Sequence, residues 1–531
     1  MKAKHAVLLP LTALVVFAAA ADSAGARWWR IVTELASDRY QGRAATTEGY
    51  RQAAAWLVAE FSKLGLEAAG TAGFLQPVPF HVRQIQEAGS SLSLVRGGLQ
   101  EVLQLGQDAY FTLNLNPAPQ VTAPAVFIGY GISAPEANYD DLAALDLKDK
   151  IAVFVRGGPA SLPPPVRAHY QTSRERLPAL RLAGAAGFAA ILDPKSMDLP
   201  WERYAALRLE PFLSLAVPGM EDGEGLRLAL TVNPAEAERW FEGSGHTAAE
   251  ILELAGAGKP LPRFPLAWSV RAAVSAERTE AECFNVVAAL PGTDPKLRQE
   301  YVVVSAHLDH QGVSTPVNGD SIYNGAMDNA SGVASLVEIA RALKAAPPRR
   351  SVLFLAVTAE EKGLLGSRYF AARPAVDKSA IVANVNLDMF LPVHPLRLLT
   401  VYGLDESSLG LNARAAAKTL GVALQADPEP QRNLFIRSDQ YSFIREGVPA
   451  LSFKFGFTKG SPEEKAQKEW LRLRYHAPSD DASQPVNLAA AARFNRLVAA
   501  VVRNVANQAS RPRWNQNSFF QRYASEGGPG R

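Results

Sequence analysis

The chain has 531 residues, more than the roughly 250–300 at which a single hydrophobic core stops growing, so we expect at least two domains. Hydrophobic residues make up 48% of it and charged residues 20%, which excludes a fibrous or disordered chain. The formal net charge of +3 is small and its cations are spread along the chain, so we expect no nucleic-acid partner.

The N-terminus has the pattern of a secretory signal peptide. Two lysines precede an apolar run from Ala6 to Ala21, and small residues offer cleavage sites ending at Ala21 or Ala26. The run is shorter than the ~20 residues that a spanning helix needs, so we expect no membrane insertion once residues 1–26 are removed. The lone cysteine, Cys283, excludes an intrachain disulfide. We therefore expect an exported protein, periplasmic or secreted.

The part of the chain before Phe284 divides into a helix, a strand and a β-rich stretch. We expect Trp28 to Gly65 to be helical, because apolar residues recur there at the spacing of one helix face. A strand is expected at Phe74 to Val82. From about Ser90, short β-like runs alternate with Gly and Pro clusters and with one helical piece, Arg176 to Gly187, which indicates a separate module.

Strand and helix patterns alternate from Phe284 onward. The expected strands are Tyr301 to Ala306, Ser351 to Val357, Ile381 to Leu387, Leu398 to Tyr402 and Ala450 to Phe455. Helices are expected at about Ser331 to Ala345 and Asn487 to Ala506. This alternation predicts an α/β fold with a mostly parallel central sheet flanked by helices, because strands buried on both faces are apolar throughout.

Acids and histidines follow the ends of these strands. They are His307 and Asp309 after the first strand, Glu360 and Glu361 after the second, Asp388 after the third, Asp328 at the start of the helix that follows the His307 loop, and His476 in a loop after the last strand. Because the carboxyl ends of parallel strands meet at one edge of a sheet, we expect these side chains to lie together.

Such a cluster indicates bound cations, because packed carboxylates repel one another and lose hydration. Two imidazoles and three carboxylates, one of them bridging, would give each of two ions three protein contacts and leave a position for water. Imidazole with carboxylate suits zinc, and an open position is typical of a catalytic site. Each residue alone is more often structural, so the prediction rests on the combination.

Five segments carry a family resemblance. They are SAHLDH (Ser305 to His310), YNGAMDNASG (Tyr323 to Gly332), TAEEKGLLGS (Thr358 to Ser367), VNLDM (Val385 to Met389) and YHAPSDD (Tyr475 to Asp481). In this order and spacing they resemble the M28 zinc peptidase family. Five matching blocks are far more specific than one short motif.

The resemblance implies two Zn²⁺ ions per chain, bridged by Asp328. His307 and Asp388 would complete one zinc site, and Glu361 and His476 would complete the other. The implied function is an exported aminopeptidase that removes N-terminal amino acids from peptides, with a zinc-bound hydroxide as the nucleophile.

Two further carboxylates receive roles from the resemblance. Glu360 would be the general base that takes a proton from the metal-bound water and passes it to the leaving amine. Asp309 would hold the ligand imidazole in its orientation without touching metal.

The middle of the chain resembles a different domain. Val126 to Pro159 resembles a protease-associated domain inserted into the peptidase, where it would act as a lid, as a guide for substrate, or only as structural bulk. The expected organisation is a peptidase domain at 27–88 and 272–510, a β-rich insert at 89–271, and a loose tail at 511–531.

The substrate pocket is the least determined part of the site. Arg437 to Phe443 resembles a block of the family, with Gln440 in place of a histidine. Asp439 is a candidate to grip a free amine and Arg437 a carboxylate. Tyr441 and Arg437 are candidate oxyanion donors, or they only shape the pocket wall.

Two other functions stay open. A carboxypeptidase or another amidohydrolase could use the same two-metal core, because the core does not select which end of the substrate is held. A non-catalytic binding protein of the same fold is the other alternative, although all five ligands and the base are in place.

Overall fold

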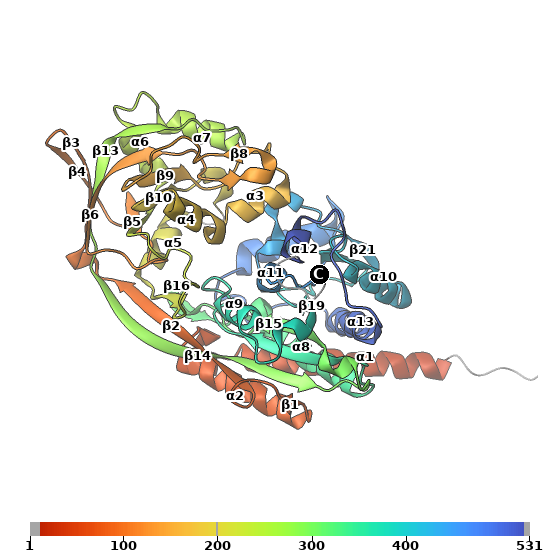
Figure 1. Cartoon of the computed structure of the whole chain (residues 1–531). Coiled ribbons are helices and arrows are strands. Elements are labelled where there is room, and N and C mark those ends of the chain that lie inside the picture. Colours follow the sequence, from red (N-terminus) through yellow and green to blue (C-terminus); the bar gives the residue numbers. More distant parts are fainter. Residues whose placement is uncertain (1–10, 198–199, 525–531) are drawn as a thin grey trace, which may run out of the picture. The chain divides into compact units, whose positions relative to one another are not determined.

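The computed structural model describes residues 11–197 and 200–524 and contains two compact units (Figure 1). Unit 1 comprises Met1–Val78 and Glu282–Arg531, and unit 2 comprises Pro79–Ala281. Two long strands, β2 (Leu75–Ile85) and β14 (Ala276–Leu290), carry the chain from unit 1 into unit 2 and back. The stretch expected as an insert, 89–271, therefore falls inside unit 2.

The sheet of unit 1 is mixed and has a parallel centre. Four strands run parallel at the centre, and they are β18 (Ser351–Val357), β15 (Tyr301–His307), β19 (Ile381–Asn386) and β22 (Ala450–Phe455). The flanking strands are β14 antiparallel to β18, β20 (Leu398–Tyr402) antiparallel to β22, and β21 (Ala423–Gln425) parallel to β20. The predicted α/β fold is confirmed, with a sheet that is parallel at its centre and antiparallel at its flanks.

Both faces of this sheet are covered, which explains its continuous apolar strands. All seven residues of β18 are buried. On one face, Leu353 and Leu355 pack with Phe370 of α9 (Leu365–Ala372) and Phe443 of α11 (Gln440–Arg445). On the other, Phe354 meets Phe61 of α2 (Glu48–Lys63), with ring centroids 6.4 Å apart. Each such side chain contributes roughly 1.5–3 kcal/mol by leaving water.

Long helices build up the rest of unit 1. They are α1 (Leu11–Leu35), α8 (Ser331–Lys344), α10 (Leu409–Leu420), α12 (Pro462–Arg474) and α13 (Leu488–Asn507). Helices α8 and α13 pack against β15 and against each other, as Figure 1 shows. The side chain of Asn487 caps α13 by accepting a hydrogen bond from the backbone of Ala490.

The expected helix from Trp28 to Gly65 is interrupted. It consists of the end of α1, a 3₁₀ segment η1 (Asp38–Arg43) and α2. The chain turns at Gln41 and Gly42, whose φ values of 47° and 67° lie in the left-handed region. The side chain of Thr47 then caps α2. The periodic apolar pattern concealed this turn.

The expected signal peptide falls partly outside the described residues, because residues 1–10 are not among them. From Leu11 onward α1 runs through both expected cleavage sites to Leu35. Within the described parts of the chain, no helix is both long enough and apolar enough to cross a membrane. Removal of residues 1–26 stays a prediction.

Unit 2 is built on a second mixed sheet. Its strand order is β4 (Leu99–Leu103), β3 (Ser91–Arg96), β13 (Phe264–Ala273), β6 (Gln120–Phe127), β9 (Ile151–Val155), β10 (Gly187–Ile191), β12 (Leu228–Val232) and β5 (Ala109–Phe111). Leu177 and Leu180 of α4 (Ser173–Leu182) pack on Phe154 and Phe188 of this sheet.

The described part of unit 2 is more helical than expected. In addition to α4 it contains α3 (Pro164–Tyr170), α5 (Trp201–Ala206), α6 (Glu238–Phe241) and α7 (Ala248–Gly256). These helices are short, so their apolar residues do not complete the repeat that marks a helix in sequence.

The tail is the clearest error of the sequence analysis. Residues 511–531 were expected to be loose, but Trp514, Phe520 and Tyr523 are buried. The indole Nε1 of Trp514 donates to the carbonyl of Gly447 at 2.9 Å. The prediction is wrong for 511–524 because aromatic side chains dock this segment on unit 1, and 525–531 lie outside the described residues.

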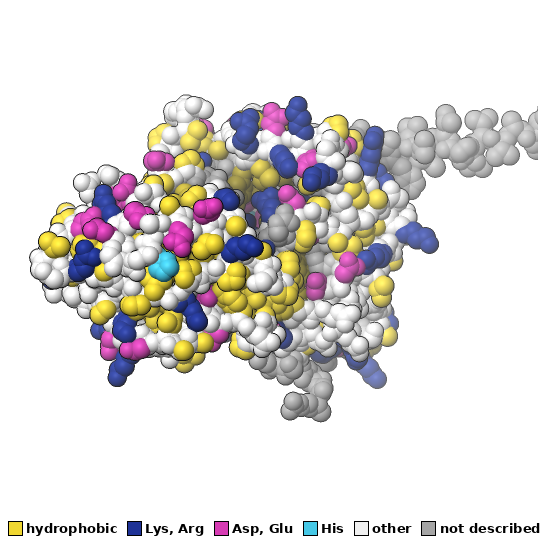
Figure 2. All heavy atoms as spheres, turned by 90° about the horizontal axis from the view of Figure 1, so that it is seen from above, with side chains coloured by type: hydrophobic (Ala, Val, Ile, Leu, Met, Phe, Trp, Pro, Cys, Tyr) yellow, Lys and Arg dark blue, Asp and Glu magenta, His cyan; other side chains and the backbone are white. Residues whose placement is uncertain are grey.

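Charged side chains of both signs are interspersed on the face drawn in Figure 2. Lys378 and Glu446 form a partly exposed ion pair at 2.6 Å. An exposed pair of this kind contributes at most about 1 kcal/mol. On the face drawn, the charges thus form no continuous stripe of one sign.

Candidate active site

The register of the parallel strands brings the candidate residues to one edge of the sheet. His307, the last residue of β15, lies opposite Val357, the last residue of β18, and Glu360 follows three residues later. Ser305 lies opposite Asn386, the last residue of β19, and Asp388 follows two residues later. All of these positions lie at the carboxyl ends of the strands, where α/β folds place their sites.

Asp328 lies between the two histidines of the cluster. Its Oδ1 is 3.2 Å from Nε2 of His307, and its Oδ2 is 3.3 Å from Nε2 of His476. Nε2 of His307 is also 3.5 Å from Oδ1 of Asp388, and Nε2 of His476 is 3.2 Å from Oε2 of Glu361. The structure thus brings all five predicted ligands together, with two carboxylates at each imidazole and Asp328 shared between them.

The spacing of these atoms matches a shared cation. Two ligand atoms that each lie about 2.0–2.1 Å from a tetrahedral ion are roughly 3.3 Å apart. The four contacts span 3.2 to 3.5 Å. The side chains of His307, Asp328 and Glu361 are at most 6% exposed, so their charges would otherwise be poorly hydrated. The donor set therefore fits bound metal, and Asp328 faces both imidazoles of the cluster.

Asp309 acts differently from what the resemblance implied. Nδ1 of His307 lies 3.0 Å from the backbone carbonyl of Asp309, so the carbonyl, and not the carboxylate, orients the imidazole. The carboxylate instead accepts the backbone N–H groups of Glu360 and Glu361 at 3.1 and 3.3 Å. Asp309 therefore holds the loop that carries the candidate base and ligand.

A second carboxylate holds the turn that carries Asp328. The side chain of Asp480 accepts the backbone N–H of Met327 at 2.9 Å and that of Asp328 at 3.0 Å. Because Asp480 lies four residues after His476, it also ties the His476 loop to this turn. The two metal-facing segments are thereby fixed relative to each other.

A buried arginine joins the loops behind the cluster. Arg43 is fully buried, and its guanidinium donates to the carbonyls of Leu308, Asn324 and Gly325 at 3.0, 2.7 and 2.9 Å. It also donates to the carbonyl of Leu35. Burial lowers the pKa of Arg43 to about 10, which leaves it charged near neutral pH. This cation partly offsets the acids of the site.

Burial and neighbouring charges shift the titration of the cluster. Burial raises the pKa of Glu360 well above its usual value, and the carboxylates of Asp439 and Asp388 add to this while His307 opposes it. Burial alone would lower the pKa of His307, but Glu360 and the other carboxylates raise it well above the ordinary value. The pocket therefore holds more negative charge than its imidazoles balance, which favours bound cations.

Left-handed backbone occurs at residues beside the ligands. Ala359, Met389 and His476 have φ values of 52°, 47° and 51°. Such conformations cost roughly 1–2 kcal/mol per residue for side chains with a Cβ. Backbone strain of this kind concentrates at functional sites, where the surrounding structure enforces it.

The expected substrate-pocket residues differ in their surroundings. Asp439 is fully buried and Tyr441 is buried, whereas Arg437 is exposed. Burial raises the pKa of Asp439 to about 7. Gln440 accepts from Asn386 at 2.8 Å and donates to the carbonyl of Phe435 at 2.8 Å. Gln440 therefore joins α11 to the end of β19.

Sequence reasoning missed several residues that contact the cluster. His310 and Gln311 both contact the carboxylate of Glu361, at 2.7 and 2.6 Å. His310 belongs to the SAHLDH block, so its position next to the predicted ligands was the available signal. Nothing in the sequence pointed to Arg43, because its partners Leu308, Asn324 and Gly325 lie more than 260 residues away along the chain.

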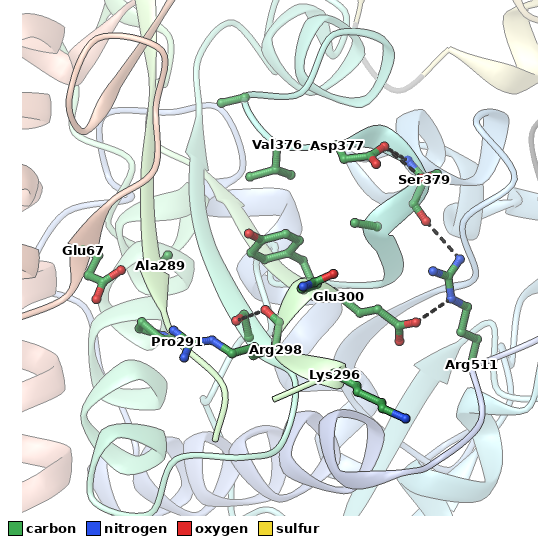
Figure 3. A pocket seen from close by; sticks show the side chains of 15 residues that line it. Glu67, Ala289, Pro291, Lys296, Arg298, Glu300, Val376, Asp377, Ser379 and Arg511 are labelled. Atoms are coloured by element: carbon green, nitrogen blue, oxygen red, sulfur yellow. Dashed lines mark hydrogen bonds and ion pairs between the residues drawn. The ribbon is translucent and has the colours of Figure 1, made fainter. Parts of the chain in front are cut away.

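A hollow of about 750 Å³ lies at the opposite edge of the sheet, where the parallel strands begin. Figure 3 shows the side chain of Arg511 reaching Glu300 and Ser379 there. The guanidinium donates to Glu300 at 2.9 Å and to the carbonyl of Ser379 at 3.0 Å. These contacts dock the tail, and the candidate ligands do not line this hollow.

Comparisons with known proteins find peptidases. The sequence model of peptidase family M28 matches residues 285–502, which confirms the resemblance of the five blocks. "Probable leucine aminopeptidase 2" of Aspergillus fumigatus is 29% identical over 237 residues, which are 42% of this chain and 44% of that protein. The chain spans about half the length of the first curated relatives that it matches.

Two further similarities cover more of the chain. An aminopeptidase of Pseudomonas aeruginosa (strain UCBPP-PA14) is 26% identical over 446 residues, which are 82% of this chain and 70% of that protein. The solved structure of an aminopeptidase from Aneurinibacillus sp. strain AM-1 has a TM-score of 0.54 and 19% identity, and covers 92% of this chain and 95% of that one. This structural likeness supports the fold.

Proposed function

We propose that this chain, which carries a peptidase family M28 domain at residues 285–502, is a zinc-dependent aminopeptidase. The observation that carries the proposal is the position of Asp328 between His307 and His476, with one carboxylate oxygen facing each imidazole. Several relatives are named aminopeptidases or zinc metalloproteases, which supports the same activity.

Two zinc ions fit the donor set. Asp328 would bridge them, His307 and Asp388 would hold one, and His476 and Glu361 would hold the other. When bound, the ions polarise the scissile carbonyl and lower the pKa of the attacking water. Neutral imidazole and carboxylate oxygens are the ligands that catalytic zinc sites commonly use.

Glu360 would be the general base. Its pKa is raised well above the usual value by burial, so its carboxylate is a better proton acceptor near neutral pH than an exposed one. The backbone of Glu360 is held by Asp309, while its neighbour Glu361 faces His476. The two adjacent residues would thereby have different roles. Glu361 would bind metal, and Glu360 would take a proton from water and pass it to the leaving amine.

The charges of the pocket favour an aminopeptidase over a carboxypeptidase. Asp439 is buried, and its carboxylate contributes to the raised pKa of Glu360. A protonated or neutral amine is compatible with such acids, whereas a substrate carboxylate would be repelled. The carboxypeptidase alternative would have to rely on Arg437, which is exposed.

A chromogenic leucine anilide and its N-acetylated form would test the proposal. We expect cleavage of the free-amine substrate only, loss of activity on chelation, and recovery with zinc. Glu360→Gln should lower kcat by about 10²–10⁴-fold while zinc content stays unchanged. Glu469→Gln, an exposed glutamate of α12, is the matched control and should be fully active.

Three results would each contradict the proposal. They are activity that survives chelation, full activity of Glu360→Gln, and faster cleavage of the N-acetylated substrate than of the free amine. The last result would favour another amidohydrolase, because the acetylated anilide has neither a free amine nor a free carboxylate.

We further propose that the protein is exported and that unit 2 is a protease-associated-type module. Export rests on the signal-like pattern of residues 1–26, and the module rests on the resemblance of Val126 to Pro159. Fractionation of cells that express the full chain tests export. N-terminal sequencing of the exported form should begin at residue 22 or 27, directly after one of the two cleavage sites.

A further inference from the structure

His310 contacts the metal-facing cluster in a way that its sequence neighbours do not explain. Its Nδ1 lies 2.7 Å from Oε1 of Glu361, while Oε2 of the same carboxylate faces His476 at 3.2 Å. Gln311 adds a second donor, because its Nε2 lies 2.6 Å from Oε2. The candidate ligand Glu361 is therefore held on both oxygens by two consecutive side chains.

The contact of His310 with Glu361 is shorter than the contacts of the two candidate ligand histidines with their carboxylates. Contacts of His307 and His476 with the carboxylates span 3.2 to 3.5 Å, close to the roughly 3.3 Å expected of two ligands on one tetrahedral ion. The contact of His310 is 2.7 Å, which falls within the roughly 2.7–2.9 Å of a charge-assisted hydrogen bond. His310 also stands 3.8 Å from the bridging carboxylate of Asp328.

The tautomer of His310 follows from its partners. An ionised carboxylate can only accept hydrogen bonds, so Nδ1 must carry the proton that Glu361 receives. Nε2 of His310 is buried and meets no hydrogen-bond partner within the described residues.

The surrounding backbone fixes the ring. His310 is 1% exposed, and its backbone N–H donates to the carbonyl of Arg43 at 3.3 Å. A Cβ on Gly325 would lie 2.5 Å from Cγ of the His310 ring, so only glycine leaves room for the imidazole. Gly325 also has a φ of 59°, which glycine adopts without strain. Its carbonyl is held by Arg43 at 2.9 Å.

We propose that His310 is a positioning residue for the metal site that Glu361 and His476 form. By holding Oε1 of Glu361, it would direct Oε2, which also accepts from Gln311 through its other lone pair, toward the ion. This would keep the carboxylate from turning to offer both oxygens, and so would leave room at that ion for water. The inference rests on the proposed two-zinc function but concerns a side chain to which no role was assigned.

Zinc binding to three variants of the full chain tests this role. His310→Phe keeps a ring of similar size and deletes the donor, whereas His310→Asn keeps an N–H close to the place of Nδ1. His394→Phe is the matched control, because His394 is another buried histidine of unit 1, bonded to Gln467. Binding is measured by competition with a chromophoric chelator, and the cobalt-substituted protein gives an absorption spectrum of the site.

We expect the substitution of His310 to weaken the binding of only one of the two ions. Wild type and His394→Phe should bind two zinc ions with the same affinities. His310→Phe should bind one ion normally and the other about 10–100-fold more weakly, with a changed cobalt spectrum. His310→Asn should recover most of this loss. Near-UV circular dichroism of the chelated proteins should show that all variants fold.

Other outcomes overturn the inference in distinguishable ways. If His310→Phe binds both ions as tightly as wild type, His310 does not position Glu361. Equal losses in His310→Asn and His310→Phe would show that the ring itself, and not the donated N–H, matters. If the wild type binds no zinc at all, the proposed function itself fails. If His310→Phe does not fold, the zinc affinity of His310→Asn decides. An affinity close to that of the wild type supports the role of the donated N–H, and a strong loss of affinity contradicts it.

Discussion

Nε2 of His476 lies 3.3 Å from Oδ2 of Asp328. The other oxygen of the same carboxylate faces His307 at 3.2 Å, so a single side chain connects the two halves of the cluster. The two histidines come from distant parts of the chain, since His307 ends β15 and His476 follows α12. Metal binding at Asp328 should therefore link segments that otherwise meet only through loops.

Asp328→Asn should abolish the binding of both ions, because an amide is a poor bridging ligand. Zinc at a concentration 100-fold above Kd stabilises a protein by about 2.7 kcal/mol for each site. We therefore expect zinc to raise the Tm of the chelated wild type and to leave that of Asp328→Asn unchanged. Differential scanning fluorimetry and metal analysis measure the two effects.

The control for this change is Asp405→Asn, which removes an exposed carboxylate paired with Arg414. It should bind zinc and gain the same Tm increase as the wild type. A bridging role for Asp328 is excluded if Asp328→Asn still binds two ions per chain with the wild-type Tm increase.

Asp309→Asn should weaken the support of the loop that carries Glu360 and Glu361. The asparagine offers one oxygen where the carboxylate accepts two backbone N–H groups, so the N–H of Glu360 or of Glu361 loses its partner. One unpaired buried N–H costs about 1–3 kcal/mol. We expect a lower Tm and a kcat/KM that is about 10–100-fold lower, the usual effect of losing a residue that supports a metal ligand.

Asp481→Asn is a suitable comparison, because Asp481 also accepts a backbone N–H, that of Ser483, but in a more exposed loop. Its kcat/KM should stay within about threefold of the wild type, since surface changes seldom exceed ±0.5 kcal/mol. If Asp309→Asn lost stability but kept full activity, Asp309 would support the fold alone.

The centre of the sheet was predictable because its strands are apolar on both faces. Each expected strand of unit 1 is present, and the positions of His307, Glu361 and Asp388 follow from the ends of those strands. The parallel register then brings these residues together, because it places the ends of β15, β18 and β19 side by side. Local sequence patterns carry this information, so no knowledge of distant contacts was needed.

Features that depend on distant contacts were not predictable. Arg43 lies in a segment that looked like the middle of a helix, yet its partners Leu308 and Asn324 are more than 260 residues away. The role assigned to the Asp309 carboxylate was misplaced, because only coordinates distinguish a backbone carbonyl from a side chain as the partner of His307. The prediction of a loose tail, which rested on composition, was wrong for the described residues 511–524, because a few aromatic side chains are enough to dock this segment on unit 1.

Trp514→Ala should destabilise unit 1 through the docked tail. The indole is 8% exposed, donates to Gly447, and packs against Phe520 with ring centroids 5.8 Å apart. Replacing a buried tryptophan with alanine costs about 3–5 kcal/mol. We expect a lower midpoint of urea denaturation and faster proteolysis after residue 510. Arg513→Ala changes an exposed neighbour and should leave both unchanged, whereas equal effects of the two variants would contradict docking by the indole.

Asp141 should give unit 2 a stability that depends on pH. Its carboxylate accepts the backbone N–H groups of Tyr130 and Ile132 at 3.1 Å and the hydroxyl of Tyr139 at 2.7 Å. Burial nevertheless raises its pKa to about 6. The folded state therefore binds this proton more tightly than the unfolded state does, and the resulting stability is present below about pH 4 and lost as the pH rises through about 6.

Asp141→Asn should remove this dependence, because the amide keeps a carbonyl oxygen for the two N–H groups and can donate to Tyr139. The Tm of the variant relative to the wild type should rise between pH 4 and pH 7, since only the wild type loses stability there through this group. Asp140→Asn, which neutralises an exposed neighbouring carboxylate, corrects for the change in net charge. A Tm difference for Asp141→Asn that stays constant across this range would mean that Asp141 is charged at every pH tested, and that its hydrogen bonds outweigh its burial.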